Sequence, residues 1–171
     1  MAASNATKSA GTVADVNPNT IIYRPITWKD VDAVVELFDR TWPQDGALAG
    51  TRFSLLISRY FVLHYLQPTT FANAAFAADG TLAGITLIRV AGERPQFDEL
   101  GVAGDLAVTE RMIRTNPEAS KRLDMLKNAF ALELDLEREG KANETTLGEL
   151  ELFVVNPDVR GCGVGGGLWD R

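Results

Sequence analysis

The sequence predicts an α/β (α+β) fold, in which a mixed, mostly antiparallel sheet is flanked by helices. Three observations support this prediction. Apolar residues recur at helical spacing after residue 30, Asp79-Gly80 separates two β-rich runs, and apolar and acidic residues alternate along 147–155. Helical spacing indicates an amphipathic helix, and Asp-Gly between β-rich runs is the strongest short-range hairpin signal. Alternation is typical of a strand.

Length and composition indicate one globular domain of ordinary size. Of the 171 residues, 46% are hydrophobic and 23% are charged, so the chain can form a core. The single cysteine, Cys162, excludes an internal disulfide framework and favours a reducing, cytoplasmic location. No apolar run approaches the roughly 18 residues of a membrane span, and a net charge of -6 argues against nonspecific nucleic-acid binding. We therefore expect neither a membrane nor a nucleic-acid partner.

Residues 1–19 are predicted to be a disordered tail, and 20–171 a single folded domain. The tail is rich in Ala, Ser, Thr and Asn and has no aromatic residue, so burial cannot repay the entropy of ordering it. It also lacks the basic start and apolar stretch of a signal peptide.

The folded part opens with five predicted segments. In chain order these are a strand at 21–26, helices at 28–40 and 51–67, and strands at 71–78 and 81–90. Thr27 and Asp30 have the spacing of a capping box at the start of the first helix. Gly84, inside the last of these strands, indicates a bulge or a close approach by another group.

Residues 91–146 are predicted to be a helical insertion between the third and fourth strands. Asn116-Pro117 is typical of an N-cap and first helical position, and Gly140 of a C-terminal stop, which predicts a helix near 117–139. The segment holds 12 acidic and 8 basic residues and so contributes -4 to the net charge. We expect a solvated helical cover, with a substrate-restricting lid as the alternative.

The strand at 147–155 and the glycine-rich segment after it are the most informative part of the sequence. Strict alternation predicts two faces: Glu149, Glu151, Phe153 and Val155 on one, and Leu150, Leu152 and Val154 on the other. A turn at 156–158 leads into Arg160-Gly161-Cys162-Gly163-Val164-Gly165-Gly166-Gly167-Leu168. Glycines let a ligand approach the backbone, and unpaired N–H groups at a helix start attract phosphate. The segment is therefore a candidate anion-binding loop, with Arg160 adding a positive charge.

Two common classes of phosphate loop fit this segment poorly. A Walker loop requires Gly-Lys-Ser/Thr, whereas Gly167 is followed by Leu168. Gly161, Gly163 and Gly166 match the dinucleotide fingerprint G-x-G-x-x-G, but that fingerprint also needs an acidic residue about 20 positions further on. Only five residues follow Gly166.

The order of motifs from Tyr23 onward resembles the GNAT N-acetyltransferase superfamily, which transfers acetyl from acetyl-CoA to an amine. Tyr23-Arg24-Pro25, with Thr27 and Asp30, is similar to the family's first strand and helix start. Asp79-Gly80 with Gly84 is similar to its central hairpin.

The most specific part of the resemblance is the cofactor motif. The stretch 152–165 is similar to the family's strand, short turn and Arg/Gln-x-x-Gly-x-Gly/Ala signature, with Arg160, Gly163 and Gly165 at the signature positions. The resemblance implies acetyl-CoA as cosubstrate. It implies pyrophosphate contacts from the backbone N–H groups of Arg160, Gly161, Cys162, Gly163, Val164, Gly165 and Gly166, and strand-like pairing of the pantetheine arm with Phe153, Val154 and Val155. Cys162 is expected to act through its backbone, with a catalytic thiol as the less favoured alternative.

The resemblance also implies direct attack by a primary amine, which must first lose a proton. Glu149 matches a strand position where some family members keep a glutamate base, and Glu151 is the alternative base or an acceptor ligand. Both glutamates could instead be solvated strand residues. His64 is expected to be a packed or rim histidine, the segment 41–50 lies where the family often shapes its acceptor pocket, and no metal ligands are predicted.

Two departures from the family pattern affect the functional prediction. A segment of 56 residues replaces the usual short turn before the cofactor strand, and the family's next strand, helix and final hairpin would follow Arg171, so we expect a truncated acetyltransferase. The alternative function is a non-catalytic acyl-CoA-binding or regulatory domain, or an inert fragment. The expected partner is a small-molecule or peptide amine acceptor. The sequence leaves undecided whether the chain forms a homodimer.

Overall fold

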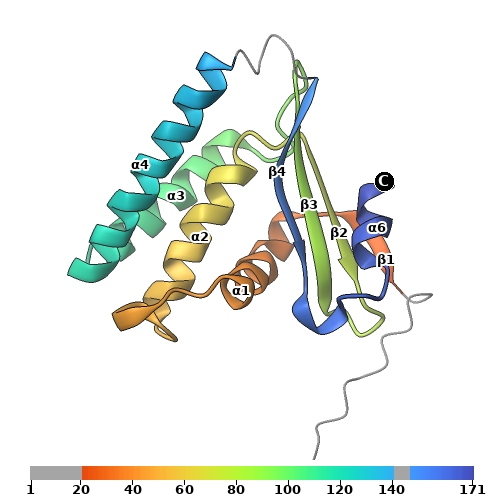
Figure 1. Ribbon diagram of the computed structural model, residues 1–171, viewed down its shortest axis with the longest axis horizontal. Coiled ribbons are helices and arrows are strands. Elements are labelled where there is room, and N and C mark those ends of the chain that lie inside the picture. Colours follow the sequence, from red (N-terminus) through yellow and green to blue (C-terminus); the bar gives the residue numbers. More distant parts are fainter. Residues whose placement is uncertain (1–20, 141–146) are drawn as a thin grey trace, which may run out of the picture.

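The computed structural model describes residues 21–140 and 147–171, in which a four-stranded antiparallel sheet is flanked by helices (Figure 1). The strand order is β1-β2-β3-β4. The elements are β1 (Ile22–Pro25), α1 (Val31–Thr41), α2 (Arg52–Leu66), β2 (Phe71–Phe76), β3 (Leu82–Val90), α3 (Glu99–Ile113), α4 (Pro117–Glu139), β4 (Gly148–Val155) and α6 (Val164–Trp169). The predicted tail, 1–19, and the last part of the predicted insertion, 141–146, lie outside the described residues.

The predicted fold class is confirmed as helices combined with an antiparallel sheet. Figure 1 shows α1 to α4 on one side of the sheet and the short helix α6 on the other. The main core lies between the sheet and α1 and α2, where Val34, Leu63, Ile85 and Leu87 are fully buried. This burial of apolar side chains is the principal stabilising contribution to the fold.

The entry into the first helix is stabilised by the predicted capping residues. The Arg24 guanidinium donates two hydrogen bonds of 2.8 Å to the Asp30 carboxylate, which also accepts from the Thr27 backbone N–H and hydroxyl at 2.8 Å. Hydrogen bonding from Arg24 holds the pKa of Asp30 well below its usual range. The predicted helix begins as a 3-10 turn, Trp28–Asp30, and continues as α1.

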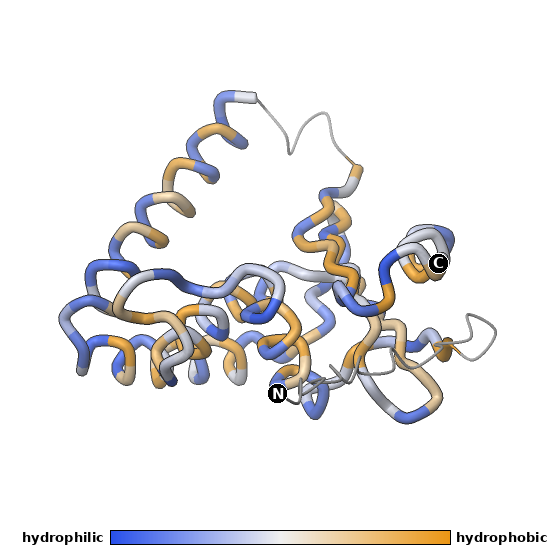
Figure 2. The backbone as a smooth tube through the Cα atoms, turned by 60° about the horizontal axis from the view of Figure 1, so that its bottom comes forward, coloured by the Kyte–Doolittle hydropathy of each residue, from blue (hydrophilic) through white to orange (hydrophobic). Residues whose placement is uncertain are grey.

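Two helices, α3 and α4, occupy the segment between β3 and β4, where the sequence predicted one. The helix predicted near 117–139 is α4, and the Asn116 side chain caps it by accepting from the Ala119 N–H at 3.0 Å. Along α4, hydrophilic and hydrophobic stretches alternate, as in an amphipathic helix (Figure 2). The sequence analysis missed α3, in which the inward-facing residues Val102, Leu106, Thr109 and Ile113 share one face but include the polar Thr109.

Gly84 allows both a bulge and a close approach, the two alternatives that the sequence left open. Pairing with β2 shifts beside it, since Ala75 lies opposite Gly84 but Phe76 lies opposite Leu82. A Cβ atom on Gly84 would lie 2.8 Å from the Val154 carbonyl oxygen and 3.0 Å from Cδ1 of Leu168. Gly84 therefore lets β4 and α6 pack closely on β3.

We expect Gly84→Ala to lower the free energy of unfolding by about 1–3 kcal/mol, because the backbone of β4 must shift to admit the methyl group. Urea denaturation followed by circular dichroism measures this change. The matched control is Gly104→Ala in α3, where no atom lies within 4 Å of the added Cβ. The control should stabilise the chain by up to about 1 kcal/mol through helix propensity. Equal stability of Gly84→Ala and wild type would contradict the close approach.

The predicted alternation of β4 is wrong because the strand contains a bulge at Glu151. Leu152 pairs with Leu87 and Leu150 pairs with Ile88, which leaves Glu151 as an extra residue. A bulge reverses the facing of side chains on its two sides. Glu149 and Glu151 therefore do not share a face with Phe153 and Val155. The two apolar residues pack near α6, whereas the two glutamates contact Arg89 on the side of the sheet that α2 and α4 cover.

Candidate functional site

The turn after β4 is anchored to the start of β3 by Asn156, which is buried. Its backbone N–H donates to the Ala83 carbonyl at 2.9 Å, and its side-chain amide donates to the Leu82 carbonyl at 3.2 Å. Its side-chain oxygen accepts from the Asp158 N–H at 3.0 Å. The sequence analysis treated Asn156 only as a turn residue, but the structure shows that it positions the glycine-rich loop.

The loop turns into α6 through two glycines in the left-handed conformation. Gly161 has φ 81° and Gly163 has φ 78°, and a Cβ atom on either would meet no atom within 4 Å. Both residues are exposed. Only glycine readily adopts this left-handed conformation, and the space in front of both residues is open. A ligand could therefore approach the backbone there.

Several backbone N–H groups of this loop are free to bind an anion. The first bond of α6 runs from the Gly167 N–H to the Gly163 carbonyl at 3.0 Å. Within the described part of the chain, five earlier N–H groups have no backbone acceptor: those of Gly161, Gly163, Val164, Gly165 and Gly166. The N–H groups of Arg160 and Cys162, which the sequence analysis also assigned to the ligand, donate within the turn at 3.4 Å and 3.3 Å.

Strand β4 forms an edge of the described sheet and pairs there with β3 alone. Its second edge, which includes Phe153 to Val155, is open for pairing. An open strand edge can bind an extended ligand that carries amide groups, as in β-augmentation. The edge runs directly into the glycine-rich loop, so one ligand could contact both.

Glu149 and Glu151 are bridged by a single guanidinium. Arg89 on β3 contacts Glu149, lies 2.9 Å from Oε1 of Glu151 through Nε, and lies 3.1 Å from Glu137 on α4. The side chain of Glu151 is 6% exposed and that of Glu149 is 34% exposed. The sequence favoured Glu149 as the base, with Glu151 as the alternative, whereas in the structure Glu151 is the buried carboxylate and Glu149 is partly exposed. Glu151 is therefore not a solvated residue.

Burial raises the pKa of Glu151 to about 7, because the charged form is poorly solvated there. The Arg89 charge opposes this rise, whereas the charges of Glu149, Glu137 and Glu133 add to it. Despite the 2.9 Å ion-pair distance, Oε1 of Glu151 is buried without a well-directed hydrogen bond. A carboxyl group with a pKa near 7 can accept a proton from a substrate at neutral pH.

Glu151 lines a cavity of about 460 Å³ between α2, α4 and the sheet, here called the acidic pocket. Its polar lining includes His64, Tyr65, Arg89, Glu133, Glu137 and Glu151. The Tyr65 hydroxyl donates to Glu133 at 2.8 Å. His64 stacks on Phe130 with ring centroids 3.6 Å apart, and burial lowers its pKa. His64 is therefore packed, which is one of the two placements, packed or rim, that the sequence predicted.

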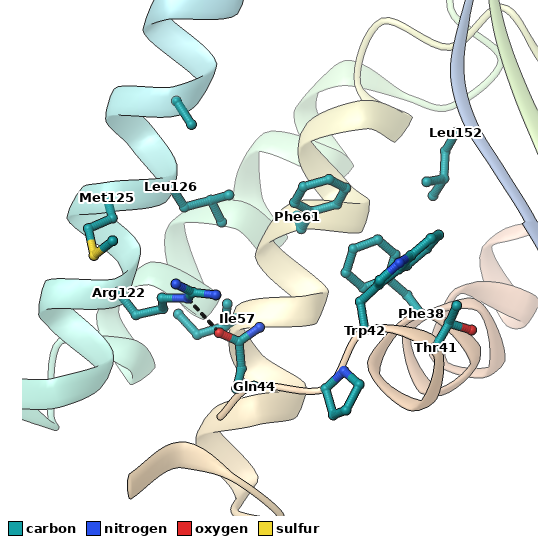
Figure 3. Close-up of a pocket in the computed structure, with 12 residues that line it drawn as sticks. Phe38, Thr41, Trp42, Gln44, Ile57, Phe61, Arg122, Met125, Leu126 and Leu152 are labelled. Atoms are coloured by element: carbon teal, nitrogen blue, oxygen red, sulfur yellow. Dashed lines mark hydrogen bonds between the residues drawn. The ribbon is translucent and has the colours of Figure 1, made fainter. Parts of the chain in front are cut away.

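A larger cavity of about 880 Å³, here called the aromatic pocket, is formed by α1, α2, α4 and Leu152 of β4. In Figure 3, Phe61 of α2 stands between Trp42 and Phe38 on one side and Arg122, Met125 and Leu126 of α4 on the other. The ring centroids of Phe38 and Phe61 are 4.5 Å apart and those of Phe38 and Trp42 are 5.0 Å apart. Trp42 and Gln44 belong to 41–50, the segment expected to shape an acceptor pocket.

Most members of the acidic pocket could not be found from the sequence. Tyr65, Arg89, Glu133 and Glu137 come from α2, β3 and α4 and form no motif. The strand glutamates were visible as candidates, but their different burial was not, since it depends on the bulge and on α4.

Comparison with known proteins gives one similar structure. No family model matches the chain, and no curated protein sequence matches it. The crystal structure of arylalkylamine N-acetyltransferase 2 from Aedes aegypti is similar, with a TM-score of 0.46 and 18% sequence identity over 89% of this chain and 68% of that chain.

Residues 21–140 and 147–171 contain neither a membrane-spanning helix nor a cluster of metal ligands. None of the helices there combines the length and the apolar character needed to cross a membrane. In the same described residues, no group of three or more His, Cys, Asp or Glu side chains is placed to hold a metal ion.

Proposed function

We propose that this chain is an N-acetyltransferase that uses acetyl-CoA and transfers the acetyl group to a primary amine by direct attack. One observation supports the proposal above the others. A strand with an open edge carries a buried carboxyl group, Glu151, and leads into a loop with five free N–H groups. This arrangement combines a place for an anionic, amide-containing ligand with a proton acceptor on the same strand.

The residues of the loop and strand fit the parts of acetyl-CoA. The free N–H groups from Gly161 to Gly166 would bind the pyrophosphate, and the open space in front of Gly163 leaves room for it. The backbone of Phe153 to Val155 would pair with the amides of the pantetheine arm. When bound, acetyl-CoA supplies an activated acyl group as a thioester.

Glu151 would act as the base toward the acceptor. An alkylamine has a pKa near 10, so most of it arrives as an ammonium ion without a free lone pair. Ionised Glu151 would accept one proton from this ammonium, and the neutral amine would then attack the thioester carbonyl. A C–N bond would form as the C–S bond breaks, and the second proton lost by the nitrogen would pass to the CoA thiolate, which leaves as the thiol. Arg89 would hold the Glu151 side chain in place, and Glu149 and Glu137 would in turn hold the Arg89 guanidinium. Placing the two reactants side by side contributes to the rate as well.

The proposal predicts that acetyl-CoA binds, that NADH does not, and that the exchange of the amide hydrogens of Gly163 to Gly166 slows by about tenfold or more on binding. Calorimetry and hydrogen exchange measure these effects, and release of CoA thiol in the presence of a primary amine reports transfer. Binding of NADH in place of acetyl-CoA would contradict the loop assignment. Binding of acetyl-CoA without any transfer would contradict the proposed activity and support the alternative, a non-catalytic acyl-CoA-binding domain.

A further inference from the structure

The acidic pocket and the aromatic pocket adjoin each other on the helix-covered side of the sheet. Consecutive residues line the two cavities: Glu151 lines the acidic pocket and Leu152 the aromatic pocket, and on α4 Phe130 lines the acidic pocket and Ala129 the aromatic pocket. The ring centroids of Phe61 and Phe130, one from each pocket, are 5.6 Å apart. A single elongated ligand could therefore occupy both cavities.

The two pockets have opposite electrostatic character. Four carboxylates, those of Glu99, Glu133, Glu137 and Glu151, and one guanidinium line the acidic pocket, so it favours a cation. The lining of the aromatic pocket contains no acidic residue and a single cation, Arg122. A ligand that matches both pockets carries its positive and negative groups at opposite ends.

Among the described residues, the two terminal guanidinium nitrogens of Arg122 are free, whereas other arginines in the same region pair with carboxylates. Its Nε donates to Oε1 of Gln44 at 2.7 Å (Figure 3), and within residues 21–140 and 147–171 no carboxylate pairs with it. By contrast, Arg114 pairs with Asp124 and Arg138 with Asp135. A planar guanidinium whose two terminal nitrogens are free can bind a carboxylate in a bidentate manner.

We propose that the acceptor is an amine with an apolar, ring-sized body and an acidic group at its far end. Its amine lies at Glu151, its body fills the aromatic pocket beside Trp42 and Phe61, and its acidic group pairs with Arg122. The pocket volume of about 880 Å³ accommodates such a body. This inference rests on the proposed function for the identity of the amine end, whereas the pairing with Arg122 is tested by binding alone.

The test compares three amines by calorimetry, with and without saturating CoA: phenethylamine, para-carboxyphenethylamine and putrescine. We expect para-carboxyphenethylamine to bind about fivefold more tightly than phenethylamine, as for an ion pair at a partly exposed site. Putrescine, which has no apolar body, should bind most weakly. Arg122→Gln should abolish the preference for the carboxylate, and Arg138→Gln, an exposed arginine of the same helix, should retain it.

Equal affinities for the two ring compounds, a preference that survives Arg122→Gln, or no binding of either compound would overturn the inference. A separate transfer assay distinguishes this failure from that of the proposed function. Transfer to both ring compounds at equal kcat/KM would support the proposed function and overturn the inference. The expected binding pattern without release of CoA thiol would support the pocket assignment and contradict transferase activity.

Discussion

Replacement of Gly163 by glutamate is expected to weaken acetyl-CoA binding by about 100-fold or more, because three effects act in the same direction. Gly163 has φ 78°, a conformation that residues with a side chain rarely adopt. The new side chain would fill open space that the ligand needs. Its negative charge would also repel the pyrophosphate. Calorimetric titration with acetyl-CoA measures the loss.

The matched control for this experiment is Gly92→Glu. Gly92 has φ 83° and no atom within 4 Å of an added Cβ, so the substitution brings the same strain and charge. It follows the end of β3, whereas Gly163 precedes Val164, whose side chain lies beside Gly84 in the first half of that strand. We expect Gly92→Glu to keep the wild-type affinity. If Gly163→Glu binds as tightly as the control, the glycine-rich loop does not bind the ligand.

Glu151→Gln is expected to lower kcat at neutral pH by about 100-fold, within the usual contribution of a general base. A base must be ionised to accept a proton, and burial raises the pKa of Glu151 to about 7. The wild-type rate should therefore rise with pH through about 7, and the variant should lose this rise. The loss should also shrink near pH 10, because the amine then arrives neutral. Rates measured against pH with saturating acetyl-CoA show both effects.

The pH dependence involves every group that lines the pocket with Glu151 or acts on its charge. These groups are Arg89 on β3, Glu149 on β4, Glu99 on α3, Glu133 and Glu137 on α4, and His64 and Tyr65 on α2. Glu149→Gln is the matched control, since Glu149 contacts the same arginine but is partly exposed. We expect a smaller loss of kcat for the control. A parental rate for Glu151→Gln across roughly pH 6 to 9 would contradict its role as base, and a larger loss for Glu149→Gln would assign that role to Glu149.

The sequence by itself determined the features that depend on local interactions. Asp79-Gly80 forms the β2–β3 turn because Gly80 adopts φ 86° and the Asp79 carboxylate accepts from the Thr81 N–H at 2.9 Å. The capping pair Thr27 and Asp30 is also where the sequence predicted it. Such contacts join residues two or three positions apart, so composition and spacing reveal them.

The bounds of α4 and the position of the glycine-rich loop were predictable for the same reason. Asn116 caps its own helix, and Gly161 and Gly163 adopt left-handed conformations that few other residues tolerate. The sequence could not show that Asn156 holds this loop against Leu82 and Ala83, because that anchor joins residues more than seventy positions apart.

The facing, the burial and the raised pKa of the candidate base, Glu151, depend on the tertiary structure. The bulge at Glu151 results from the register of β4 against β3, and alternation along one strand does not reveal where a partner strand shifts. The burial of Glu151, its contact with Arg89 and the nearby charges of Glu133 and Glu137 come from elements distant in the chain. A pKa depends on solvation and on charges within a few ångströms. The pKa of Glu151 therefore depends on how the sheet and α4 pack together.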